Sequence, residues 1–133
     1  LDFQYGPNSP VLFTDNVYVG VPSPLKDQDL NGVVFCDMPW VIQESGTIQE
    51  RRRQAEQVWA KSDKEAPRLF ALGMDAFRIA DRWAAFVSET NAQLPGMTGQ
   101  LSLDQRTHQV HRHLSCSRFV DGQPKNIGRP YSF

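Results

Sequence analysis

We predict a mixed α/β fold for this chain, on the basis of three patterns in its sequence. Residues 32–36 form an uninterrupted apolar run, which is typical of a strand that is covered on both faces. Residues 67–90 carry apolar side chains at helical spacing and therefore predict one long helix. From Leu101 to Cys116 apolar and polar residues alternate, which indicates a β-hairpin. Together these patterns predict central sheet strands flanked by helices, followed by a hairpin.

The first part of the chain predicts short strands joined by a loop. Residues 11–13 read Val-Leu-Phe, which suits a short buried strand, and residues 17–19 predict a second extended piece. Residues 21–31 contain two prolines and several charged side chains, so we expect a loop there. Asp37 directly follows the apolar run and would lie at the carboxyl edge of the sheet, where α/β proteins usually place their clefts.

A first helix is predicted from a capping box. Thr47 and Glu50 have the spacing in which a threonine hydroxyl caps the helix and the glutamate reaches back to the cap. We expect this helix to run to about Lys61, with a buried stripe and an exposed basic run. The stripe consists of Ile48, Ala55 and Trp59, and the basic run of Arg51, Arg52 and Arg53.

The helix predicted over residues 67–90 is the strongest element of the sequence. Its apolar sector is wide, so we expect it to be mostly buried under a sheet and beside other helices. Gly73 lies inside this helix at a cost of about 1 kcal/mol relative to alanine, and close approach of a neighbouring backbone would explain it. Asp75 falls on a narrow polar strip, where we expect a surface carboxylate that pairs with Arg78.

The predicted hairpin turns at residues 104–106, and the chain then bends near residues 122–124. We expect residues 1–10 and 125–133 to be loop or tail, because neither stretch shows a regular pattern.

Composition and charge exclude several classes of protein. Hydrophobic residues make up 40% of the 133 residues and charged residues 22%, which is a globular rather than a disordered balance. The net charge of −1 argues against a generic nucleic-acid binder, and no apolar run reaches the roughly 18 residues of a membrane span. Residues 1–66 carry a net charge of −4 and residues 67–133 one of +3. This asymmetry fits ordinary surface variation or a mildly basic face for an acidic partner.

The two cysteines, Cys36 and Cys116, are 80 residues apart, which excludes a CxxC redox pair and a zinc knuckle. Both lie in apolar runs, so we expect buried free thiols. A disulfide would require that the two strands are neighbours and that the compartment is oxidising.

No pattern of catalytic or metal-binding residues is complete. His111 and His113 lie on one face of the predicted strand, but a third ligand is missing. Asp37 and Asp75 would form a carboxylate pair only if the fold brought them together. Nucleophile elbows, phosphate-binding loops and zinc-protease motifs are absent from the sequence. We therefore expect no enzyme, no metal and no cofactor.

Three stretches in the same order resemble the LppC lipoprotein family: GVVFCDMPW (32–40), RLFALGMDAFRIADRW (68–83) and GMTGQLSLDQRTHQVHRHL (96–114). The resemblance implies a partial type I periplasmic-binding-protein-like (Venus flytrap) domain, with residues 1–133 as a single fragment of a two-lobed domain. Such a domain needs roughly twice this length. We therefore expect an excised piece, or a short relative that completes its core by homo-oligomerisation.

The resemblance also implies a function. It implies a non-catalytic periplasmic protein that binds and activates a bifunctional, class A penicillin-binding protein in peptidoglycan synthesis. The parent would be held at the outer membrane by a lipid anchor that this chain does not contain. The alternative is one lobe of a receptor for an amino acid or amide, for which Asp37 and Thr14 offer polar groups at strand ends. A hydrolase is disfavoured, because the nucleophile motifs are absent.

Five residues are candidates for ligand or partner binding. Asp37 and Trp40 end a strand at the edge that would face a cleft, and the basic run supplies charged anchors for a protein partner. This run consists of Arg51, Arg52 and Arg53.

Overall fold

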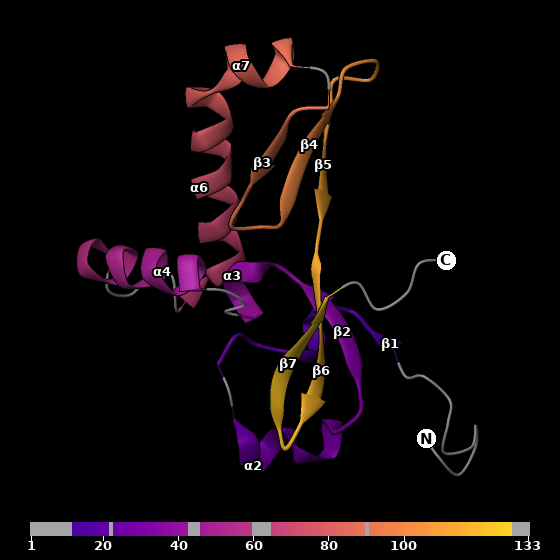
Figure 1. Cartoon of the computed structure of the whole chain (residues 1–133). Coiled ribbons are helices and arrows are strands. Elements are labelled where there is room, and N and C mark those ends of the chain that lie inside the picture. The colour runs from indigo at the N-terminus through magenta and orange to yellow at the C-terminus, as the bar shows by residue number, and fades with distance from the viewer. Residues whose placement is uncertain (1–11, 22, 43–45, 60–64, 90, 129–133) are drawn as a thin grey trace. The chain divides into compact units, whose positions relative to one another are not determined.

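The computed structural model describes residues 12–21, 23–42, 46–59, 65–89 and 91–128 (Figure 1). The chain divides into two units, which we describe separately. Unit 1 comprises residues 1–36 and 116–133, and unit 2 comprises residues 37–115. The loop predicted at residues 1–10, Val11 of the first predicted strand and residues 129–133 of the predicted tail lie outside the described residues.

Unit 1 is organised by a four-stranded sheet with the strand order β1-β2-β6-β7. The strands are β1 (Leu12–Phe13), β2 (Val34–Asp37), β6 (Ser115–Val120) and β7 (Gln123–Gly128). β1 and β2 are parallel, with Leu12 opposite Val34. The predicted strand at 32–36 is confirmed as β2, and its residues are mostly buried. The shorter strand predicted at 11–13 is present as β1. The prediction that it is buried was wrong, because β1 is an edge strand on which Leu12 and Phe13 are 54% and 45% exposed.

β6 and β7 form an antiparallel hairpin. The turn between them holds Asp121 and Gly122, which both have positive φ, 51° and 66°. Asp-Gly is a preferred pair for such a tight hairpin turn, because both positions tolerate the left-handed region. The bend predicted near residues 122–124 is therefore this turn, whereas the tail predicted from residue 125 is wrong as far as residue 128.

Short helical turns connect β1 to β2, where we had expected an extended piece and a loop. They are η1 (Asp15–Val17), α2 (Pro24–Asp27) and η2 (Gln28–Leu30). Pro24 occupies the first turn of α2, where a missing N–H costs nothing. The amide of Ser23 donates to the Asp27 carboxylate at 3.0 Å and holds this turn closed.

An aromatic cluster forms the interior of unit 1. The rings of Phe35 and Phe119 stack with their centroids 5.1 Å apart, and Tyr18 packs against both at 5.7 and 6.0 Å. All three side chains are buried. Aromatic pairs of this kind contribute about 0.5–1.5 kcal/mol beyond the burial of their area.

Cys36 and Cys116 form a disulfide, so the expectation of free thiols was wrong. The two residues lie on neighbouring strands, since the amide of Phe119 donates to the carbonyl of Val33 at 3.0 Å. Because the cysteines are 80 residues apart, local sequence patterns did not indicate that their strands are neighbours.

Unit 2 contains four helices among its described residues: α3 (Pro39–Ile42), α4 (Gly46–Val58), α6 (Pro67–Asp81) and α7 (Trp83–Ser88). The predicted capping box is wrong, because α4 already includes Gly46 and Thr47 therefore lies inside its first turn. Glu50 instead pairs with Arg53 one turn further along. The helix ends at Val58, before the predicted end near Lys61, and Trp59, which was expected in its buried stripe, is 52% exposed.

The single helix predicted over residues 67–90 is two helices. Arg82 leaves the helical region, with φ −110° and ψ 17°, and separates α6 from α7. Neither glycine nor proline marks this break in the sequence, so local propensity did not indicate it.

The predicted hairpin is confirmed as β4 (Gln100–Asp104) and β5 (Gln109–His113), which pair antiparallel, and β3 (Gln93–Pro95) adds a third strand. Leu94, Leu101 and Leu103 pack with Phe86 of α7 to form the core of this region. β5 is exposed along its whole length, including His111 and His113. Within the described part of the chain, no helix has the length and hydropathy needed to cross a membrane.

Candidate partner-binding groove

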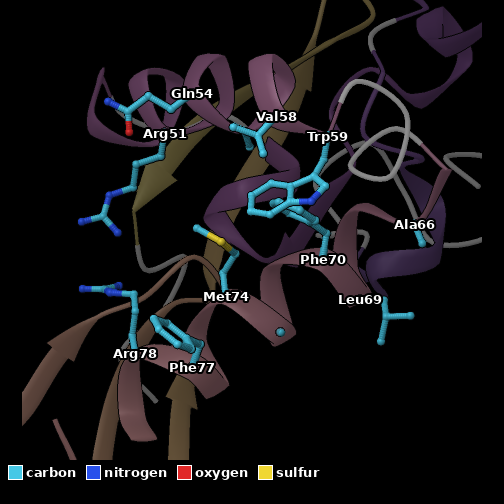
Figure 2. Close-up of a pocket in the computed structure, with 12 residues that line it drawn as sticks. Arg51, Gln54, Val58, Trp59, Ala66, Leu69, Phe70, Met74, Phe77 and Arg78 are labelled. Carbon is cyan, nitrogen blue, oxygen red and sulfur yellow. The ribbon is translucent and has the colours of Figure 1, made fainter. Parts of the chain in front are cut away.

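α4 and α6 enclose a groove with a volume of about 980 Å³ (Figure 2). α4 contributes Ala55 and Val58, which are three residues apart, and Trp59 directly follows the end of the helix. This spacing places Ala55 and Val58 on one side of the helix, because residues three and four apart are neighbours on a helix surface. Figure 2 shows Val58 and Trp59 above the side chains that α6 contributes.

α6 contributes a longer stripe that repeats every three or four residues: Leu69, Phe70, Gly73, Met74 and Phe77. The expectation that this helix is mostly buried was wrong, because Leu69 is 70% and Phe77 74% exposed. The wide apolar sector is therefore largely a surface of the described structure. A contiguous apolar surface of this kind is typical of an interaction site.

Gly73 lies in the wall of the groove. A Cβ built on this residue has no heavy atom of another group within 4 Å. The close backbone approach predicted from the sequence is thus not made by any described residue. The space in front of Gly73 is open to whatever occupies the groove.

Two arginines provide the charges of the groove lining. Arg51 from α4 and Arg78 from α6 extend to the same side of the groove in Figure 2, and no aspartate or glutamate belongs to the lining. Burial lowers the pKa of Arg78, and the positive charge of Arg51 lowers it further, while Asp75 acts in the opposite direction. Among the described residues Arg51 has neither a hydrogen bond nor an ion pair. This end of the groove is therefore suited to an anionic group.

Trp40, a candidate binding residue, is fully buried beside the groove. Its ring packs on Phe70 with the centroids 5.4 Å apart, and Phe70 in turn packs on Trp59 at 5.8 Å. The Arg52 guanidinium lies over the Trp40 ring, 5.4 Å from its centroid, and donates to the Trp40 carbonyl at 2.8 Å. Trp40 and Arg52 therefore hold α4 in place, and their part in partner binding stays a prediction.

Asp37, the other candidate at the strand end, is buried and paired with Arg68 of α6. Its Oδ2 accepts a hydrogen bond from Arg68 at 2.6 Å, and its Oδ1 accepts one from the Met38 amide at 2.7 Å. These partners compensate the desolvation of the carboxylate, which would otherwise be costly. They also anchor the first turn of α6, so that Asp37 has a positioning role for the groove.

Asp75 is buried, which corrects the expectation of a surface carboxylate. It lies 3.7 Å from Arg78, as expected, but it also accepts three hydrogen bonds of 2.8 Å from the Met97 amide, the Thr98 amide and the Thr98 hydroxyl. Arg78 donates to the carbonyl of Pro95 at 2.6 Å. Through these contacts α6 holds the loop that joins β3 to β4. Asp37 and Asp75, which would have formed a carboxylate pair only if the fold brought them together, are hydrogen-bonded to different partners.

The three arginines of the basic run have three different surroundings. Arg51 lines the groove, Arg52 contacts Trp40, and Arg53 is exposed and pairs with Glu50. Sequence reasoning found this run but missed the groove. The repeat of apolar residues on α6 was visible in the sequence, but such a repeat usually indicates a buried helix face, so it was interpreted as core.

Thr14, the polar residue considered for binding a small ligand, is exposed and follows β1.

The described residues contain no cluster of three or more histidine, cysteine, aspartate or glutamate side chains that would hold a metal ion.

Comparison with known proteins relates the chain to one family of lipoproteins. The family model "LppC putative lipoprotein" matches residues 1–122. Penicillin-binding protein activator LpoA from Vibrio cholerae is 37% identical over 88 residues, which are 66% of this chain and 14% of that protein. LpoA from Photobacterium profundum is 31% identical over 102 residues, 76% of this chain and 16% of that protein. The chain therefore spans about one seventh of the length of these relatives.

Solved structures show the same fold. The C-domain of LpoA from Haemophilus influenzae, described as a regulator of PBP1A, matches with a TM-score of 0.68 and 22% identity over 95% of this chain and 39% of that chain. A structure described as "a putative branched-chain amino acid ABC transporter" from Chromobacterium violaceum matches with a TM-score of 0.55 and 32% identity, over 85% and 35% of the two chains. The mixed α/β architecture is thus that of a part of these domains.

Proposed function

Because the chain belongs to the LppC lipoprotein family, we propose that it is part of a non-catalytic cell-envelope protein that binds a bifunctional penicillin-binding protein and raises its activity. The observation that carries this proposal is the family match over residues 1–122, together with relatives that are named as activators. The exposed apolar groove also supports a role in binding a protein.

We place the protein in the periplasm, with a parent chain that a lipid anchors to the outer membrane. The disulfide between Cys36 and Cys116 supports this location, because disulfides persist in oxidising compartments such as the periplasm.

Within this proposal, α4 contacts the synthase through Arg51 and Arg53, which lie two residues apart and therefore on different sides of the helix. Arg53 is exposed and Arg51 stands at the rim of the groove. Arg52 is not a suitable test residue, because it donates to the Trp40 carbonyl and its loss would disturb α4.

Titration of the chain onto the purified periplasmic region of a class A penicillin-binding protein tests this function. Full-length LpoA from Vibrio cholerae serves as the positive control. We expect saturable binding that becomes weaker in the Arg51→Glu/Arg53→Glu variant and is unchanged in Arg118→Glu, which reverses an exposed charge on β6. Binding by the control protein without binding by this chain would contradict a contact surface in these residues.

The second candidate function is a receptor lobe for an amino acid. The match to the Chromobacterium violaceum structure favours it, but the Asp37 carboxylate is already engaged by Arg68. A rise in melting temperature with added leucine, isoleucine or valine would support a receptor, since a ligand that binds only the folded state stabilises it. The activator proposal predicts no such rise.

A further inference from the structure

The groove between α4 and α6 has the geometry of a site for a third helix. On each of the two helices the lining residues repeat every three or four positions, as they do where helices pack together. Along α6 they extend from Ala66, the residue before its first turn, to Arg78, which corresponds to a length of about 18 Å. About three turns of helix would cover this length.

Gly73 points to a close occupant. Glycine costs about 1 kcal/mol in a helix interior, and here no described residue uses the space that its missing side chain leaves. Small residues in helix interfaces let the backbone of the neighbouring helix approach closely. An occupant whose backbone passes over Gly73 would give this glycine a function.

The charges specify the kind of occupant. Arg51 and Arg78 stand on one side of the groove. Arg78 lies 3.7 Å from the buried Asp75 carboxylate and donates to the Pro95 carbonyl, so the charge without a partner among the described residues is that of Arg51. A second copy of this surface would bring two further arginines toward them. A segment with an acidic side chain would instead relieve the repulsion between Arg51 and Arg78.

We propose that the groove binds an amphipathic helix of a partner protein, whose apolar face lies on α4 and α6 and whose acidic side chain lies opposite Arg51 and Arg78. This is the helix-in-groove mode of recognition, in which residues at positions i, i+3, i+4 and i+7 act as anchors. The inference rests on the proposed function only for the identity of the partner, because the chemistry of the groove is independent of it.

Calorimetric titration with two synthetic peptides tests the proposal. Both are amphipathic helices of three to four turns with leucine and alanine on one face. One carries glutamate on both terminal turns and the other carries lysine at the same positions. We expect the glutamate peptide to bind about fivefold more tightly than the lysine peptide. We also expect this preference to fall in Arg51→Gln, which removes a rim charge without breaking a hydrogen bond or ion pair of the described residues.

A steric variant tests the place of binding. Gly73→Leu fills the open space in the groove wall, so we expect it to weaken binding of both peptides about tenfold. Ala76→Leu is the matched control, because Ala76 is exposed on the same helix and does not line the groove. Circular dichroism of both variants establishes that they are folded.

Each outcome decides the proposal. Equal binding of the two peptides, or unchanged binding by Gly73→Leu, would overturn it. Self-association of the chain that Gly73→Leu abolishes would assign the groove to a second copy and overturn it as well. Binding of the synthase without binding of either peptide would support the proposed function and contradict a helix-binding groove. Binding of the glutamate peptide without binding of the synthase would support the groove and contradict the proposed function.

Discussion

The Asp75 carboxylate joins α6 to the loop between β3 and β4. It is 3% exposed and accepts its hydrogen bonds from Met97 and Thr98, so its charge is compensated inside the protein. Gly96, which precedes these residues, is equally constrained: a Cβ there would lie 2.5 Å from the Asp75 carboxylate and 2.8 Å from the Gly99 carbonyl oxygen. Only glycine fits this approach.

Replacement of Asp75 by asparagine should destabilise the fold. Hydrogen bonds to a charged group contribute about 1.5–3 kcal/mol, and the amide nitrogen of asparagine offers a donor where the loop amides need an acceptor. We expect the free energy of unfolding in urea to fall by about 2 kcal/mol. Asp81→Asn, at an exposed position of the same helix, is the control and should leave it nearly unchanged. A similar loss in both variants would contradict the role assigned to Asp75.

Asp104 makes the stability of the β4–β5 hairpin depend on pH. The Thr107 hydroxyl, followed by the amides of Arg106 and Thr107, donates to this carboxylate and lowers its pKa. Because the pKa of Asp104 is lower in the folded state, its ionised carboxylate stabilises the folded state at pH values above the unfolded pKa of about 3.9. This contribution to the free energy of unfolding is lost as the pH falls through the folded-state pKa. NMR titration of the Asp104 carboxyl carbon should show a midpoint that rises in Thr107→Val. An unchanged midpoint would show that the hydroxyl has no such effect.

At the level of elements, α6 combines two different surfaces. One anchors the helix through Arg68 and Asp75, and the other leaves Leu69 and Phe77 exposed along the groove. The hydrogen-bonded side fixes the position of the helix, so that the apolar side is presented without being covered. This arrangement explains how a helix of strongly apolar sequence can form a surface.

Gly73→Ala should stabilise the described fold. The added methyl group meets no atom within 4 Å, and alanine is favoured over glycine in a helix by about 0.5–1 kcal/mol. We expect a corresponding increase in the free energy of unfolding in urea. Gly96→Ala should have the opposite effect, because its Cβ would collide with Asp75. A destabilised Gly73→Ala variant would show that described residues already use this space.

At the scale of the whole molecule, the disulfide joins the two ends of the chain segment that forms unit 2. The chain leaves unit 1 directly after Cys36 and re-enters it at Cys116, so the bond closes residues 37–115 into one covalent loop. Such a bond stabilises mainly by reducing the conformational freedom of the unfolded chain, in the loop-entropy account.

The Cys36→Ser/Cys116→Ser variant should be less stable by about 4.5 kcal/mol, which is the value the loop-entropy account assigns to a loop of this length. Thermal unfolding monitored by circular dichroism should show a lower melting temperature. Dithiothreitol should lower the melting temperature of the natural chain in the same way and leave the variant unaffected. A natural chain that is insensitive to dithiothreitol would contradict the disulfide.

Local patterns in the sequence were sufficient to predict the mixed α/β class, strand β2, the β4–β5 hairpin and most of α6. Each of these depends on the periodicity of neighbouring residues, which reflects the geometry of a single helix or strand pair. The prediction of β7 failed because residues 123–128 show no clear alternation, and only pairing with β6 makes them a strand.

The tertiary structure alone decided the pairing of the cysteines, the burial of Asp75 and the exposure of the apolar face of α6. Each depends on which distant segment lies beside the residue: β6 beside β2, the loop at residues 96–98 beside α6, and α4 across the groove. Separation along the chain carries no information about such neighbours. The residues proposed for binding were therefore recognisable in the sequence by their types, whereas their positions depend on contacts between segments that are far apart in the chain.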